Sequence, residues 1–170
     1  GGVGTLGCGL TCVVLSLLGF CLPCAAAPVG DVAPELSEHL GQSPALVVVV
    51  CGGEDRDLSA VTQLVESTPW TLFCRSDGAM RLDRIRDWAR EHGHLGRRVY
   101  AVDDNNTSLH LADGMADAVW VAPGATGVPA EQEVMRVLHP GGVYVSADRV
   151  VVRPADPGVD QWRHPYHGPD

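Results

Sequence analysis

The 170-residue chain carries a formal net charge of −9, with 12 arginines, no lysine and 21 acidic residues. Hydrophobic residues make up 45% of the chain and charged residues 19%, a composition typical of a globular domain and not of a disordered segment. The acidic balance argues against non-specific nucleic-acid binding, which needs cationic side chains to neutralise phosphates. We therefore expect one folded domain and no nucleic-acid partner.

The first part of the chain resembles an export segment. Leu10–Ala27 is apolar and ends in small residues, and no charged residue precedes Asp31. This layout is typical of a secretory signal, although the run is also long enough for a membrane anchor, and a mistranslated leader is a third alternative. We expect residues 1–27 to be a signal peptide or membrane anchor, which gives an exported protein in the periplasm or cell envelope. Any membrane contact is expected through this segment alone.

Residues 28–44 are rich in Pro, Gly and Ser, which predicts a linker with a short polar helix around Pro34–Leu40. Strand-like and helix-like segments alternate after it. Apolar runs predict strands at 45–51, 70–74, 98–102, 118–122 and 143–147, with an edge strand at 150–152. Apolar residues at helical spacing predict helices at 58–66, 79–92 and 129–138. The alternation predicts an α/β fold, a Rossmann-like three-layer sandwich with a mainly parallel central sheet.

Two stretches resemble class I S-adenosylmethionine-dependent methyltransferases (type 11-like). Leu109–Val119 (LHLADGMADAV) is similar to the family's L-P-F-x-D-x-x-F-D-x-V segment, and Glu133–Gly142 (EVMRVLHPGG) to its E-x-x-R-V-L-K-P-G-G segment. The resemblance implies a methyltransferase-like Rossmann-type domain over residues 45–153. That domain is truncated relative to the full fold, because the family's final antiparallel strand pair has no counterpart after the fifth expected strand.

The resemblance also implies where S-adenosylmethionine would bind. In the family, glycines after the first strand let the backbone approach the cofactor, and acids after the second and third strands bind its ribose and adenine. The matching positions are Gly52 and Gly53 in the loop, Asp77 and Asp103. Asp77 equally suits a turn or a helix N-cap, and Asp103 equally suits the turn that follows it. We expect Gly52, Asp77 and Asp103 to face one crevice.

The glycine loop departs from the family pattern. The family's G-x-G-x-G is replaced by Cys51-Gly52-Gly53-Glu54-Asp55, and Val48 and Val49 stand where an acid usually holds the cofactor's amino group. No G-x-G-x-x-G of a nicotinamide-dependent oxidoreductase follows a strand. Two hypotheses remain: methyl transfer to an unknown small molecule, or a degenerate, non-catalytic binding or scaffold module with weak or lost cofactor binding.

No catalytic residue for methyl transfer can be assigned. His110 and His139 are candidates by residue type alone, and no metal site is expected.

Residues 154–170 are rich in proline and glycine and are expected to form a linker. Asp160–Asp170 (DQWRHPYHGPD) resembles the D-D-W-T-H-x-x-H-x-x-x-N phrase of large exported bacterial proteins. There the phrase joins a methyltransferase-like domain to a β-propeller of the pyrroloquinoline-quinone-binding type. The resemblance implies a C-terminal propeller domain in the same polypeptide.

Overall fold

The computed structural model describes residues 34–52, 55–77, 82–103 and 108–155. The expected export segment (residues 1–27), Gly53 and the Asp160–Asp170 phrase lie outside them. The helices are α2 (Pro34–Leu40), α3 (Asp55–Ser67), α4 (Asp83–Glu91) and α5 (Glu131–Val137). The strands are β1 (Leu46–Val50), β2 (Thr71–Ser76), β3 (Val99–Asp103), β4 (Ala116–Val121), β5 (Leu138–Val145) and β6 (Val150–Val152).

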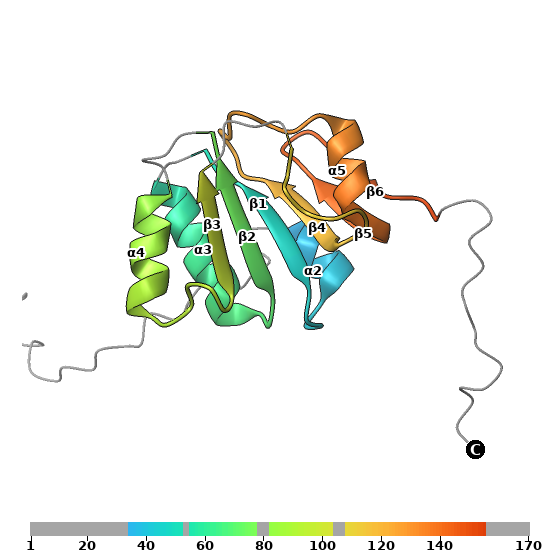
Figure 1. Cartoon of the computed structure of the whole chain (residues 1–170). Coiled ribbons are helices and arrows are strands. Elements are labelled where there is room, and N and C mark those ends of the chain that lie inside the picture. The colour runs from blue at the N-terminus through green and yellow to red at the C-terminus, as the bar shows by residue number, and fades with distance from the viewer. Residues whose placement is uncertain (1–33, 53–54, 78–81, 104–107, 156–170) are drawn as a thin grey trace, which may run out of the picture.

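The strands form one six-stranded sheet in the order β3-β2-β1-β4-β5-β6. The first five strands in this order pair in parallel, and β6 pairs antiparallel with β5. The central strand β1 is a run of valines that are at most 1% exposed, as expected for a strand covered on both faces. This architecture confirms the expected Rossmann-like α/β fold with a mainly parallel sheet (Figure 1).

Helices cover the two faces of the sheet unequally. On one face, α2, α3 and α4 pack against alternate residues of β1 to β5 and form the larger core, which includes Leu36, Trp70 and Ile85. On the other face, α5 and the segment before β4 pack against β1, β4 and β5 through Val134, Val137 and Leu109. Figure 1 shows α4 at the left of the sheet, α3 partly behind β3 and β2, and α5 at the upper right near β6. The helices on the two faces and the sheet between them make up the three layers.

Several boundaries differ from the sequence prediction. The segment predicted as a linker contains α2, and Leu36 of this helix is fully buried in the larger core, so the folded unit begins before residue 45. Strand β2 extends to Ser76, two residues beyond its predicted end at Cys74, and Asp77 is the first residue after it. Strand β5 begins at Leu138, directly after α5, and its register with β4 shifts between Ala116 and Ala118.

The predicted edge strand is present as β6. Among the described residues, no helix combines the length and apolar composition needed to span a bilayer.

Candidate functional site

The described residues expected to bind the cofactor lie at one edge of the sheet. Gly52 follows β1, Asp77 follows β2 and Asp103 ends β3. These three strands are adjacent, and Ser76 pairs with Asp103 in the β2–β3 register. Ligands of parallel α/β sheets bind beyond the carboxyl ends of the strands, which is this edge. The topology therefore brings Gly52, Asp77 and Asp103 to the place where the resemblance puts a cofactor.

Gly52 is buried beneath the connection between β4 and α5. A Cβ atom placed on Gly52 would lie 2.7 Å from the carbonyl oxygen of Gly124 and 2.8 Å from its carbonyl carbon. Because those are backbone atoms, the contact cannot be relieved by moving a side chain. Gly52 is needed here for a close approach of two backbones of the same chain.

The same connection also covers Asp77. Gly127 has a positive φ of 64°, and a Cβ atom placed on it would lie 2.8 Å from Cβ of Asp77 and 3.2 Å from its carboxylate carbon. Asp77 is half-buried at the end of β2. The carboxylate expected to bind ribose hydroxyls therefore lies against the chain's own backbone.

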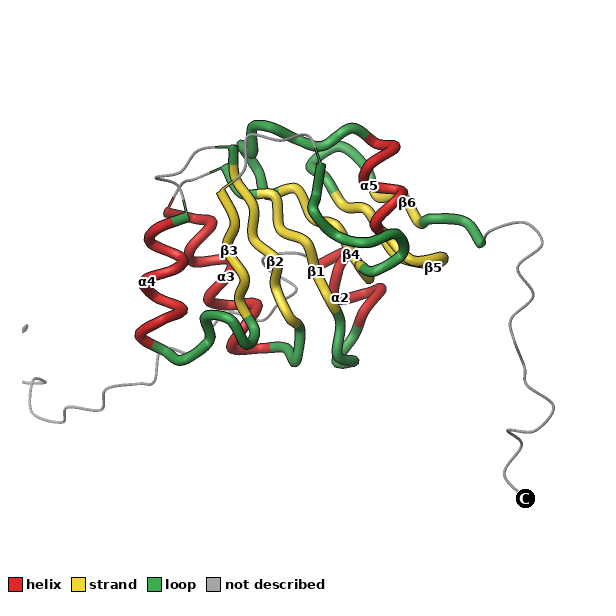
Figure 2. The backbone as a smooth tube through the Cα atoms, in the orientation of Figure 1, coloured by secondary structure: helices red, strands yellow, loops and turns green. Residues whose placement is uncertain are grey.

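We call residues Pro123–Ala130 the crossing loop. It starts after β4, which neighbours β1 and not β2, yet its Gly124 lies on Gly52 and its Gly127 lies on Asp77. The loop must therefore pass over the carboxyl end of β1 to reach that of β2. In Figure 2 this connection runs along the upper ends of the strands before it reaches α5. The loop therefore contacts two of the residues expected to bind the cofactor.

Asp103 has a structural partner on α4. Its Oδ2 forms an ion pair with Nη1 of Arg86, and Arg86 also donates from Nη2 to the carbonyl oxygen of Ala101 at 3.0 Å. Asp83 accepts a further bond from Arg86 at 3.0 Å, and these hydrogen bonds raise the pKa of Arg86 although burial opposes the shift. Oδ1 of Asp103 is buried without a hydrogen-bond partner among the described residues. Asp103 therefore joins α4 to β3, and its second oxygen is buried without a hydrogen bond from the described residues.

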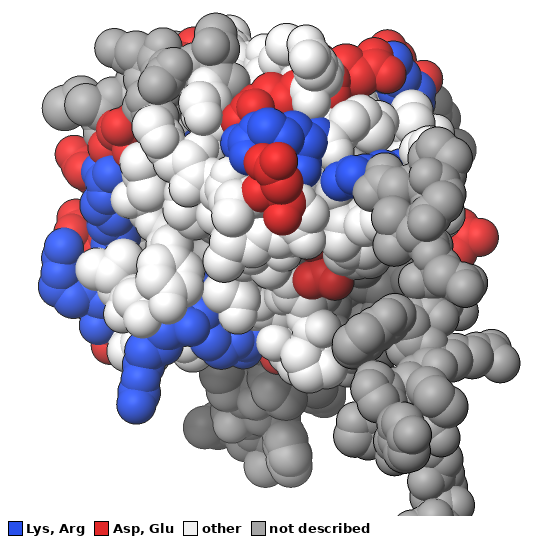
Figure 3. Space-filling view, turned by 45° about the vertical axis from the view of Figure 1, so that its right-hand side comes forward, with Lys and Arg blue, Asp and Glu red and all other residues white. Residues whose placement is uncertain are grey.

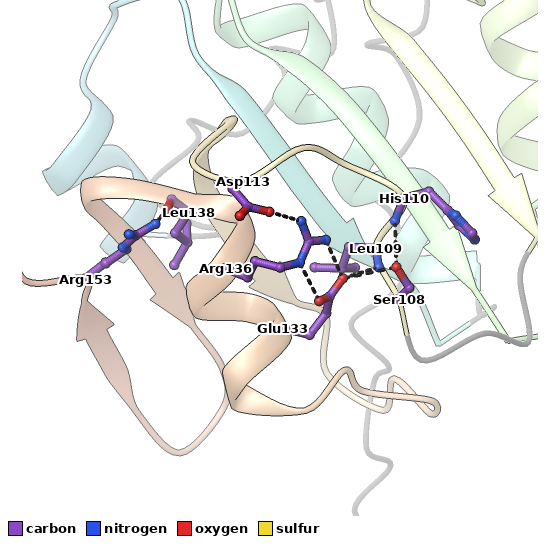
Figure 4. Close-up of polar contacts among 8 residues, drawn as sticks. All are labelled: Ser108, Leu109, His110, Asp113, Glu133, Arg136, Leu138 and Arg153. Carbon is purple, nitrogen blue, oxygen red and sulfur yellow. Dashed lines mark hydrogen bonds and ion pairs between the residues drawn. The ribbon is translucent and has the colours of Figure 1, made fainter. Parts of the chain in front are cut away.

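The second family-like segment builds a polar cluster between α5 and the segment before β4 (Figure 4). Glu133 accepts hydrogen bonds from the backbone N–H of Leu109 at 2.7 Å and from Ser108 Oγ at 3.2 Å. Arg136 donates to both oxygens of Glu133, each at 2.7 Å, and to Asp113 at 2.5 Å. The hydrogen bond from Arg136 is the main reason that the pKa of Glu133 falls to about 2. Glu133 and Arg136 of this segment thus stabilise the scaffold.

Charged side chains elsewhere are also paired locally. On α4, Arg90 pairs with Asp87 at 2.6 Å, and Arg84 pairs with Asp55 of α3. The face drawn in Figure 3 accordingly shows basic and acidic atoms adjoining within a largely uncharged surface. Interleaved pairing of this kind produces solvated helix faces and not a basic stripe.

Of the two histidine candidates, His139 lies at the opposite end of the sheet from Gly52 and Asp77. His139 is at the amino edge of the sheet, where its Nε2 lies 3.0 Å from Oδ1 of Asp117 and its Nδ1 lies 2.6 Å from the carbonyl oxygen of Pro140. Asp117 also accepts the backbone N–H of Leu46 at 2.6 Å, which joins the starts of β1 and β4. His110 is exposed with a positive φ of 49°. His139 is therefore not placed to act on a ligand at the carboxyl edge.

A cavity of about 250 Å³ lies at the amino edge, at the opposite end of the sheet from Gly52. Its lining consists of α2 and the following turn together with the starts of β1, β4 and β5: His39, Leu40, Ser43, Pro44, Ala45, Asp117, His139, Gly141 and Val143. In the described part of the chain, no three His, Cys, Asp or Glu residues are grouped so that they could hold a metal ion.

Sequence reasoning missed a group of buried polar residues near the carboxyl edge. Asp57 and Arg75 are each 3% exposed and Ser76 is fully buried. Cys51 and Cys74 are free thiols in the larger core, and the hydrogen bond between them, together with burial, raises the pKa of Cys51. Little in the sequence indicates this group, because the predicted strand ends at Cys74 and the residue types of Arg75 and Ser76 suggest a loop.

Comparison with solved structures supports the architecture. The chain is similar to a putative sarcosine dimethylglycine methyltransferase from Galdieria sulphuraria, with a TM-score of 0.53 and 18% identity over 69% of this chain and 45% of that one. It is also similar to geranyl diphosphate C-methyltransferase from Streptomyces coelicolor A3(2), solved with S-adenosyl-L-homocysteine, with a TM-score of 0.55 and 23% identity over 67% and 43% of the two chains. The described residues share the fold of these methyltransferases.

This methyltransferase-like domain spans less than half of each of those structures, which agrees with the expected truncation. Another similar structure is the [4+2]-cyclase SpnF, with a TM-score of 0.56 and 22% identity over 68% of this chain and 43% of that one. No protein-family sequence model matches the chain, and no curated protein matches it either. Likeness at these identities establishes the fold, and one fold can host several activities.

Proposed function

We propose that this chain carries a non-catalytic methyltransferase-like module, whose S-adenosylmethionine site is filled by the crossing loop. The observation that carries the proposal is the double contact of that loop, through Gly124 on Gly52 and through Gly127 on Asp77. A small-molecule site needs a cavity of about 300–1,000 Å³. Backbone packed against backbone at the end of β1 occupies part of the space that such a site would need.

The residues present do not fit the cofactor. The family's acid for the amino group is replaced by buried valines of β1, which offer no hydrogen bond. A lost charge-assisted hydrogen bond costs about 1.5–3 kcal/mol, which is about ten- to a hundredfold in affinity. Oδ1 of Asp103 has no hydrogen-bond partner among the described residues but is buried, so it supports residual nucleoside binding at most. No catalytic step is therefore assigned.

Calorimetric titration tests this proposal. S-adenosylmethionine and S-adenosyl-L-homocysteine are titrated separately into the purified chain, with the Streptomyces coelicolor enzyme that was solved with the second compound as the positive control. We expect no saturable heat with either compound up to about 1 mM, which corresponds to less than about 4 kcal/mol of binding free energy. A dissociation constant in the low micromolar range would restore the methyltransferase hypothesis.

The wider setting of the module is part of the same proposal. We propose that it belongs to an exported protein, in which residues 1–27 direct export and residues 154–170 lead into a propeller domain. The supporting observations are the uncharged apolar Leu10–Ala27 and the Asp160–Asp170 phrase. Export suits a module that does not use a cytosolic cofactor. Mass spectrometry of secreted material tests this setting, since an intact N-terminus on that material would count against cleavage.

A further inference from the structure

The cavity at the amino edge lies between the end of α2 and the starts of β1, β4 and β5. Leu36 of α2 is fully buried in the larger core, so this wall of the cavity is held in place. The volume of about 250 Å³ is slightly below the roughly 300–1,000 Å³ of sites for drug-sized ligands, so an occupant must be small. The lining combines apolar side chains (Leu40, Pro44, Ala45 and Val143) with polar ones (His39, Ser43, Asp117 and His139).

Asp117 and His139 place two hydrogen-bond acceptors side by side in this lining. The carbonyl oxygen of Pro140 can only accept, so the Nδ1 atom of His139, which lies 2.6 Å away, carries the ring proton. On the neutral imidazole the Nε2 atom then has a lone pair. It lies 3.0 Å from Oδ1 of Asp117, which is also an acceptor when the carboxyl group is ionised. Two acceptors at this distance repel each other unless they share a donor.

The pair is both fixed and accessible. Oδ2 of Asp117 accepts the backbone N–H of Leu46 at 2.6 Å, which holds the carboxylate at the start of β4. The side chains of Asp117 and His139 are 33% and 40% exposed, so solvent and small solutes reach them. Groups that are already held in position lose little freedom when a ligand binds.

The chemistry of the lining selects an organic cation. A metal ion is a poor occupant, because nowhere in residues 34–52, 55–77, 82–103 and 108–155 are three His, Cys, Asp or Glu side chains grouped to hold one. An anion would be repelled by Asp117. A primary ammonium group has a positive charge and three N–H donors, so it can serve both acceptors at once. The chain contains no lysine, so none of its side chains supplies this group.

The other charged and titratable groups around the pair leave this role open. His39 of α2 lines the cavity, and β1 contributes the uncharged Ala45. Arg153, which follows β6, directs its guanidinium group to the carbonyl oxygen of Leu138 and is not part of the lining. Asp117 therefore sets the charge of the cavity, which is negative while both imidazoles are neutral.

We propose that the amino-edge cavity binds a small aliphatic primary amine as its ammonium ion. The ammonium group donates to Oδ1 of Asp117 and to Nε2 of His139, and the alkyl chain lies against the apolar part of the lining. A proton on Nε2 of His139 takes the same place, so the proton and the ligand compete. The proposal does not depend on whether the cofactor site is closed, because the cavity is at the opposite end of the sheet from Gly52.

NMR titration of the 170-residue chain with n-butylammonium chloride tests the proposal. We expect the amide shifts of Gly141 and Val143 to saturate at pH 8 with a dissociation constant on the order of 1–10 mM, as suits so small a ligand. Butyltrimethylammonium has the same charge and chain but no N–H donor. It should bind at least about tenfold more weakly, because it cannot form the charge-assisted hydrogen bonds. Affinity for butylammonium should also fall between pH 8 and pH 5.5, the range in which imidazoles take up a proton.

Two variants locate the site. His139→Lys introduces the residue that the family segment has at this position, and its own ammonium group should pair with Asp117 and abolish binding of butylammonium. Asp117→Asn removes the charge and should weaken binding at least about tenfold. His92→Lys is the matched control, because His92 is exposed at the end of α4 and lies outside the lining, and it should leave the affinity unchanged.

Three results would overturn the proposal, and the first two need no variant. Shifts that rise without saturation would mean that the cavity does not bind an ammonium ion. Equal affinity for the two ammonium ions, or an affinity that is the same at pH 5.5 and pH 8, would mean that the shared donor is not used. Undiminished binding by a folded His139→Lys chain would place the ligand elsewhere.

Discussion

Glu133→Gln is expected to destabilise the domain by about 1–2 kcal/mol at pH 7. The Glu133 carboxylate accepts four hydrogen bonds, from Leu109, from Ser108 and twice from Arg136. A glutamine amide keeps one oxygen but turns an NH₂ group toward donors, so part of the cluster loses its acceptor. Breaking the cluster releases the segment before β4 from α5.

The size of the expected destabilisation follows from the lowered pKa of the Glu133 carboxylate. A pKa of about 2 in place of 4.5 corresponds to about 3 kcal/mol at 1.36 kcal/mol per pH unit. The Arg136 side chain is 32% exposed, so solvent screening reduces this upper bound to the expected 1–2 kcal/mol. Because the folded-state pKa lies below the unfolded-state value, the stabilisation is present above about pH 4.5 and is lost as the pH falls toward 2.

Urea unfolding followed by circular dichroism measures the effect. The difference between the unmodified chain and Glu133→Gln should be largest at pH 7 and should shrink by pH 3. Glu131→Gln is the matched control on the same helix, because Glu131 is 53% exposed and pairs only with Arg149 in the described structure. It should cost less than about 0.5 kcal/mol. The reasoning fails if Glu133→Gln costs no more than this control, or if its cost is the same at pH 3.

Arg98→Met should cost about 2–4 kcal/mol in the same assay, because the guanidinium bonds three carbonyl oxygens at the end of α3 and the start of β2, whereas the exposed Arg97→Met should be near neutral. Gly52→Ala should cost about 1–3 kcal/mol through its clash with Gly124, and a neutral result would place the crossing loop elsewhere. Cys51, whose pKa is raised, should resist alkylation by iodoacetamide at pH 8.5 in the native state and react after unfolding, as peptide mass spectrometry can determine.

The fold was predictable from local patterns. Four consecutive valines in β1 specify a strand covered on both faces, and alternation with amphipathic helices then specifies a parallel sheet. Boundaries were less accurate where polar residues are buried. Arg75 and Ser76 belong to β2 although their residue types suggest a loop, and Leu36 makes α2 part of the core although its helix is mostly polar.

The position of the expected cofactor site was predictable from the sequence, but the packing of the crossing loop against its residues was not. Residues at the ends of adjacent strands must meet at one edge, so Gly52, Asp77 and Asp103 could be placed together from order alone. The sequence of the crossing loop does not indicate which strand ends the loop contacts. Its contacts depend on two glycines approaching residues about 50 to 75 positions away, and such long-range packing has no local signature.

The most direct test of the closed cofactor site is NMR observation of the crossing loop during addition of S-adenosylmethionine. We expect a nuclear Overhauser effect between an α-proton of Gly52 and the amide proton of Ala125, whose nitrogen would lie 3.1 Å from a Cβ atom placed on Gly52. We also expect this signal and the Gly127 amide shift to stay unchanged up to about 1 mM ligand. Loss of the signal together with a Gly127 shift that saturates at micromolar ligand would show that the loop moves aside for the cofactor, and would contradict the account.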